Sequence, residues 1–196
     1  MKGVFDVTFQ SALDVFNYGL VLIYGLFLRV SIAGGCTEKR DKKLVALLCP
    51  VFLVLQSLFA LTLGTDKTMQ LYPLIVHLPL VLILTLALKK PLGVAVVSTC
   101  TAYLCCQPLR WGKNAVEALT GSMLAADIAY IVLLVGVVAL GERFLVQAAY
   151  ATMTYSRWTL LLFGSLPVSY YICDYATTGY SNALYSNVLI ISEFLP

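Results

Sequence analysis

Residues 71–90 form one apolar stretch, LYPLIVHLPLVLILTLALKK, whose length suits a helix that crosses a bilayer at about 1.5 Å per residue. It carries His77, the single histidine of the chain, between Pro73 and Pro79. Because polar groups are costly in hydrocarbon, we expect His77 to face protein or a wet cavity. Pro79 removes the backbone hydrogen bond to Ile75, which predicts a kink beside a buried imidazole. A simple hydrogen bond to a neighbouring helix would explain this histidine equally well.

Composition then sets the class of protein. Hydrophobic residues make up 60% of the 196 residues and charged residues only 12%, whereas about 25% of the residues in soluble domains are charged. The mean hydropathy is +0.89. We therefore predict an all-α, polytopic helical membrane protein whose first partner is the lipid bilayer. Its length allows six spans plus the start of a seventh, and leaves no room for a soluble catalytic domain.

Charge and cysteine content argue against other classes. The net charge of +3 is small, and the basic residues are concentrated in a few connections, so we expect no nucleic-acid partner. The six cysteines fall mostly within apolar runs and are interpreted as free thiols that pack as small hydrophobic side chains. The adjacent Cys105 and Cys106 would point about 100° apart on a helix. We predict no metal site and no cofactor.

The six spans follow from the apolar runs. We predict them at residues 15–32, 44–63, 71–90, 92–107, 122–140 and 158–173. A polar loop is predicted at 108–121, and a longer, weakly amphipathic connection at 141–157. Ser122 is expected to cap the fifth span. The last residues, 188–196, are expected to begin a seventh helix that is too short to cross.

Lysine and arginine predict the orientation, because they are enriched in cytoplasmic connections. Nine lie in the first, third and fifth connections: Arg29, Lys39, Arg40, Lys42, Lys43, Lys89, Lys90, Arg143 and Arg157. The opposite side has four: Lys2, Lys67, Arg110 and Lys113. This count places the amino terminus outside, residues 33–43 in the cytoplasm and residues 177–187 outside.

Polar and aromatic side chains gather near the outer ends of the predicted spans. His77 and Asp127 each lie about five residues inside, and we expect them to pair across the third and fifth helices. The candidates for ligand sensing are His77, Asp127, Gln107, Tyr72, Tyr130, Tyr171 and Asp174. They predict an outward-opening cup with polar groups and aromatic walls. An interfacial aromatic belt with ordinary helix-end polarity would also explain the tyrosines.

Three stretches carry a resemblance to a known family: LYPLIVHLPLVL, TAYLCCQPLRW and YYICDYATTGYSNALYSN, with EFLP behind the last. They resemble the amino-terminal membrane sensor region of bacterial GHKL-type sensor histidine kinases, relatives of the peptide-pheromone receptor kinases. The resemblance implies a sensor domain at 1–187 in the bacterial cytoplasmic membrane. It also implies an extracellular peptide or small-molecule signal.

In such kinases the sensor precedes a cytoplasmic dimerisation helix and an ATP-binding domain. The resemblance thus implies a homodimer at full length and a response regulator reached through the kinase domain. The sequence has no kinase domain and no asparagine- and glycine-rich boxes for ATP. We therefore expect a sensor that is cut off as its last helix begins, with kinase activity only in full-length relatives.

Two functions from different classes are compatible with these patterns. The first is the signal-sensing input region of a two-component sensor histidine kinase. The alternative is a small polytopic transporter or a membrane-embedded enzyme that uses His77 and Asp127 as a proton relay. Inverted internal repeats would favour transport, and none is convincing here. The sensor is preferred, chiefly through the resemblance.

Overall fold

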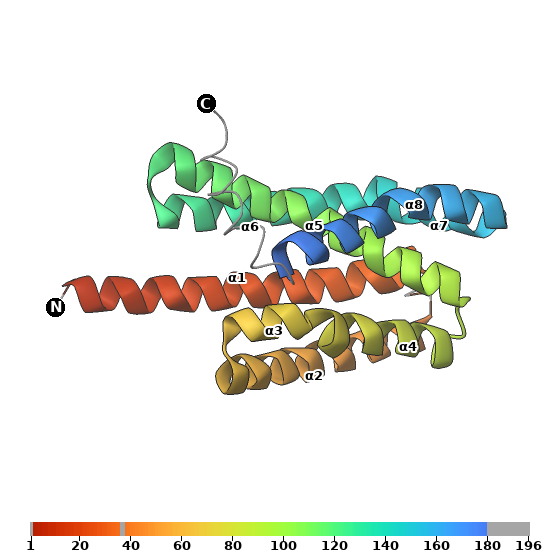
Figure 1. Cartoon of the computed structure of the whole chain (residues 1–196), viewed down its shortest axis with the longest axis horizontal. Coiled ribbons are helices and arrows are strands. Elements are labelled where there is room, and N and C mark those ends of the chain that lie inside the picture. The colour runs from red at the N-terminus through yellow and green to blue at the C-terminus, as the bar shows by residue number, and fades with distance from the viewer. Residues whose placement is uncertain (1, 36–37, 180–196) are drawn as a thin grey trace, which may run out of the picture.

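The computed structural model describes residues 2–35 and 38–179, and every regular element in these ranges is a helix (Figure 1). The predicted all-α class is therefore confirmed. The predicted seventh helix at 188–196 lies outside the described residues. The elements, with η for a π-helical turn, are α1 (Lys2–Ile32), α2 (Lys39–Leu63), α3 (Thr65–Tyr72), η1 (Pro73–His77), α4 (Leu78–Leu86), α5 (Leu92–Thr120), α6 (Met123–Leu140), η2 (Gly141–Leu145), α7 (Val146–Tyr155), α8 (Arg157–Asp174) and η3 (Tyr175–Gly179).

Three of the long helices contain a π turn. The elements α3, η1 and α4 form one continuous helix, because the residues at their junctions keep helical backbone angles. In the same way η2 joins α6 to α7, and η3 continues α8. The turn at η1 has a local cause: Pro79 cannot donate to the carbonyl of Ile75 and crowds it. The preceding turn widens, and the Leu78 N–H reaches back to the Pro73 carbonyl.

Helix α1 is central to the packing. It lies between α2, α3 and α4 on one side and α5 to α8 on the other (Figure 1). Leu22 and Leu26 of α1 belong to one buried cluster, with side chains of α2, η1 and α4. Leu28 and Ile32 belong to a second cluster, with side chains of α5, α6 and α7. Because α1 is shared by both clusters, it joins the two halves into one bundle.

The connections between helices are short and use suitable residues. Gly64, between α2 and α3, has a φ of 85°, which favours glycine. Gly121 ends α5 with a φ of 66°, and the Ser122 side chain then accepts the Ala125 N–H at 3.3 Å. The predicted cap at Ser122 is thus confirmed. Ser156 alone joins α7 to α8 and forms a capping box with Thr159.

The polar loop predicted at 108–121 is wrong, because these residues are almost entirely helical. Helix α5 continues through Pro108 as far as Thr120. The loop was predicted from polarity, but polar side chains can point away from the core without ending a helix. The predicted, weakly amphipathic connection at 141–157 is helical over residues 141–155, which form η2 and α7. Helix α5 ends at Gly121 and α7 ends at Ser156, where the backbone leaves the helical region.

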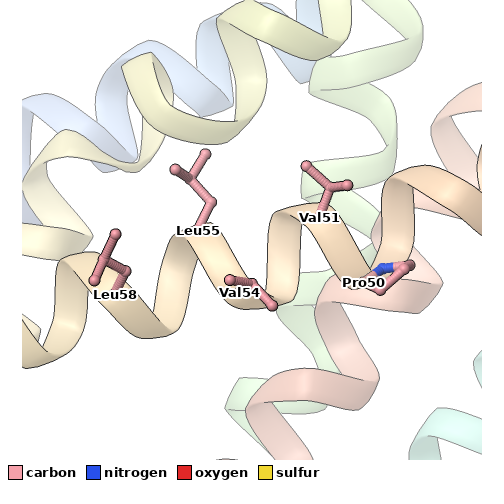
Figure 2. A pocket seen from close by; sticks show the side chains of 5 residues that line it. All are labelled: Pro50, Val51, Val54, Leu55 and Leu58. Atoms are coloured by element: carbon pink, nitrogen blue, oxygen red, sulfur yellow. The ribbon is translucent and has the colours of Figure 1, made fainter.

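Three helices in the described residues are long and apolar enough to cross a membrane: Lys39–Leu63, Leu92–Thr120 and Met123–Tyr155. Two shorter apolar helices cover Gly19–Ile32 and Gln70–Leu86. The outer face of α2 is apolar and exposed. Figure 2 shows a hollow on it that is lined by Pro50, Val51, Val54, Leu55 and Leu58. These features are compatible with a membrane location, and six spans stay a prediction.

Candidate functional site

His77 is a buried residue surrounded by half-buried tyrosines. Its side chain is 4% exposed, and Nδ1 lies 2.6 Å from the hydroxyl oxygen of Tyr171. Four tyrosine rings surround the imidazole, with centroid distances of 5.0 Å for Tyr72, 5.6 Å for Tyr103, 5.3 Å for Tyr171 and 6.2 Å for Tyr175. We call these five residues the His77 cluster.

The cluster is assembled from three helices. Tyr72 ends α3 and His77 ends η1, so the π turn sets their relative orientation. Tyr103 comes from the middle of α5. Tyr171 lies in the last turn of α8, and Tyr175 begins η3. Two π turns therefore contribute to one cluster, and such turns are frequent at functional sites because they redirect side chains.

Polar groups extend the cluster along α5 and α8. The Tyr103 hydroxyl donates a hydrogen bond to the Asp174 carboxylate, and Gln107 also hydrogen-bonds Tyr103. The structure thus gathers several predicted candidates around His77: Tyr72, Tyr171, Gln107 and Asp174. Helix periodicity explains the arrangement, since Tyr103 and Gln107 are one turn apart and share a face of α5.

Asp127 belongs to a different group. Its side chain is fully buried at 0% exposure and lies 2.6 Å from Lys113 Nζ. Asn17 Nδ2 donates to the same carboxylate oxygen at 3.0 Å. Tyr130, one turn further along α6, is buried in the apolar core. A salt bridge between α5 and α6, supported from α1, accounts for this aspartate.

The structure does not bring His77 and Asp127 together. His77 and Asp127 were expected at the same depth in the membrane, and this expectation assumed that the third span begins at residue 71. The continuous helix instead begins at Thr65, so His77 lies near its middle. Asp127 lies in the second turn of α6. The two residues are therefore at different distances from their helix ends.

The outward-opening cup stays a prediction, and two apolar hollows on α2 lie apart from its residues. One is the hollow of Figure 2, and the second lies beside it on α2, lined by Leu53, Val54, Ser57, Leu58 and Leu61. None of the seven candidates lines either hollow. Across the described residues, no three His, Cys, Asp or Glu side chains could hold a metal ion together.

Sequence reasoning missed three residues of these groups and one further buried charge: Tyr103, Lys113, Asn17 and Arg29. Lys113 and Arg29 were interpreted as charges of connections, but Lys113 pairs with Asp127 and Arg29 is buried in α1. Tyr103 could have been found from the sequence, because it lies four residues before Gln107 and therefore shares a helix face with that candidate. For Asn17 the only signal in the sequence is its position within an apolar run, because a polar side chain there needs a hydrogen-bond partner.

Comparison with known proteins finds no family model, no curated protein and no solved structure that matches this chain. Function is therefore argued from the residues and their geometry.

Proposed function

We propose that this chain is the membrane-embedded signal-sensing region of a GHKL-type sensor histidine kinase, oriented with its amino terminus outside the bacterial cytoplasmic membrane. The resembling stretches support this proposal, and the His77 cluster supplies a place for sensing. The observation that carries it is the 2.6 Å hydrogen bond between His77 Nδ1 and the Tyr171 hydroxyl. This bond links the π turn of one helix to the last turn of α8.

The geometry suits a switch in helix position. A signal molecule that hydrogen-bonds His77 or Tyr171 competes with the bond between them. Asp174, in the last turn of α8, is held by Tyr103 in the same region. A ligand that binds the opened arrangement more tightly shifts the equilibrium toward that arrangement of α8. The size of this shift is set by the difference between the ligand's affinities for the two arrangements. Such a shift is the form of output that an input region passes to a kinase.

The alternative function has less support. A transporter or membrane-embedded enzyme with a relay through His77 and Asp127 needs proton donor and acceptor within hydrogen-bond reach. His77 instead bonds Tyr171, and Asp127 is held by Lys113 and Asn17. The sensing proposal needs only contacts that the His77 cluster already makes.

A reporter experiment tests the proposal. In a bacterial strain, the chain is fused ahead of the last membrane helix and the cytoplasmic part of a GHKL-type kinase, so that the kinase lies in the cytoplasm. Response-regulator phosphorylation is then measured while peptide and small-molecule fractions are added. We expect some fractions to change the output, and His77→Phe and Tyr171→Phe to fix it. Tyr155→Phe is the matched control, because Tyr155 is 83% exposed. An output that no fraction changes, or that both cluster variants leave responsive at equal protein levels, contradicts the proposal.

A further inference from the structure

Arg29 is a buried arginine that forms no salt bridge within residues 2–35 and 38–179. It lies near the end of α1, and its side chain is 4% exposed. Two guanidinium nitrogens, Nε and Nη1, are buried and have no hydrogen-bond partner among the described residues. Arginine keeps its charge at all relevant pH values. A buried and unpaired ion costs several kcal/mol, so its presence inside the bundle calls for an anion.

Arg29 lies one helical turn after two residues of α1 that face the neighbourhood of His77. Leu26 belongs to the same buried cluster as Ile75 and Val76, which directly precede His77 in η1. A Cβ added at Gly25 would lie 3.7 Å from Cys106 Sγ of α5. Residues three and four apart share one face of a helix, and long side chains lean toward the helix amino terminus. The guanidinium of Arg29 is therefore directed to the region where α1 packs against η1 and α5.

His77 offers a second donor at the same place. Its Nε2 atom is buried and, like the Arg29 nitrogens, has no hydrogen-bond partner in the described part of the chain. When the Tyr171 hydroxyl donates to Nδ1, the ring hydrogen is on Nε2. Two unused donors, one of them cationic, then lie in one buried region. Asp174, in the last turn of α8, accepts a hydrogen bond from Tyr103.

We propose that Arg29 and His77 bind one carboxylate group of a small-molecule or peptide signal. The inference rests on the proposed sensing function and adds the chemical class of the signal. A carboxylate matches the planar fork of a guanidinium, which can donate two parallel hydrogen bonds to it. The His77 Nε2 hydrogen supplies a third donor. Binding at this point would act directly on the His77 contact with Tyr171.

The test uses the purified full chain in nanodiscs of phosphatidylcholine and follows its thermal unfolding midpoint. The probe is hexanoate, and hexanol is the uncharged control. A ligand in tenfold excess over its Kd should raise the midpoint by about 3–6 °C. We expect this rise with hexanoate and none with hexanol. Equal rises with both, or no rise with hexanoate up to its solubility limit, overturn the proposal.

Three variants locate the effect. Arg29→Met should abolish the hexanoate response and leave the free protein equally or more stable, because it removes an unpaired buried charge. Arg157→Met, on an exposed side chain, should keep the response. His77→Phe should weaken hexanoate binding about tenfold, since it removes a hydrogen bond to a charged group. If Arg29→Met does not fold, Arg29→Lys should still weaken binding about tenfold, because it lacks the fork. A response that survives loss of the guanidinium overturns the proposal.

Other anions are separate arms of the same experiment. Inorganic phosphate should raise the midpoint less than hexanoate, and an equal rise overturns the choice of carboxylate. Nanodiscs that contain phosphatidylglycerol test a lipid headgroup as the anion. A rise in these nanodiscs that needs Arg29 but no hexanoate also overturns the proposal. If the reporter responds to added fractions but hexanoate has no effect in nanodiscs, the sensing function is retained and only the carboxylate ligand class is rejected.

Discussion

At the scale of single residues, Asp127 shows how a carboxylate is kept inside an apolar bundle. Its partner Lys113 is 24% exposed, whereas Asp127 is fully buried. The lysine can therefore reach water if the aspartate is removed, because its long stem lets the charge move outward. The aspartate has no such freedom. The two halves of this salt bridge should thus differ in what their loss costs.

We predict that Lys113→Met lowers the free energy of unfolding by about 3–5 kcal/mol, because it leaves a buried carboxylate without its cation. Asp127→Asn should cost less, and the double variant should cost clearly less than the sum. Lys67→Met, on an exposed side chain of α3, is the control and should be near neutral. Chemical unfolding in detergent measures all four. Additive single effects would mean that Lys113 and Asp127 do not interact.

A second double-variant cycle concerns His77 and Asp127. Because they have separate hydrogen-bond partners, we expect the effects of His77→Ala and Asp127→Ala on the free energy of unfolding to add within about 0.5 kcal/mol. The same unfolding measurement checks this. A coupling well above that value would restore the pair that the sequence suggested.

At the scale of elements, α5 and α8 approach closely at Gly164. A Cβ added there would lie 2.6 Å from Val97 Cγ2, and valine cannot easily turn aside. We predict that Gly164→Ala lowers the free energy of unfolding by about 1–3 kcal/mol through overpacking. Gly136→Ala on α6 is the matched control, because nothing lies within 4 Å of its added Cβ. It should be neutral or stabilising by up to about 1 kcal/mol. Equal effects in unfolding measurements would contradict this account of the contact.

The elements also show what the sequence could predict. Apolar runs correctly predict where helices exist, and Ser122 predicts a cap that the structure contains. Apolar runs do not predict helices in polar segments, such as the part of α5 around Lys113. The charge of Lys113 is satisfied there by Asp127. The candidate site was predicted in part, since Tyr72, Tyr171 and His77 do meet. Arg29 was missed because a basic residue near a helix end resembles a topological signal.

At the scale of the whole molecule, the two ends of the bundle should lie on opposite sides of a membrane. Helix α5 has 29 residues, or about 43 Å at 1.5 Å per residue, which exceeds a hydrocarbon core of about 30 Å. At one end, Lys90 Nζ donates to the Gly34 carbonyl at 2.8 Å, so two connections rich in basic residues meet there. The positive-inside rule predicts that this end is cytoplasmic.

Cysteine labelling checks the orientation. In a background without native cysteines, we expect Thr120→Cys to react with an impermeant maleimide in intact cells. Lys89→Cys should react only after permeabilisation. Both positions are exposed, so access is decided by the membrane and not by burial. Labelling of position 89 in intact cells would reverse the orientation, and labelling of both would mean that α5 does not cross.

The close contact at Gly164 has a mechanical consequence. It holds the middle of α8 against Val97 of α5, while the end of α8 is restrained through Tyr171 and Asp174. In the proposed sensor, release of those two side chains would leave an arm that pivots at Gly164. From Gly164 to Tyr171 the arm is about 10 Å long at 1.5 Å per residue, and a swing of about 10° would move its tip by about 2 Å. The loss of two hydrogen bonds would thus become a displacement of the chain that follows α8.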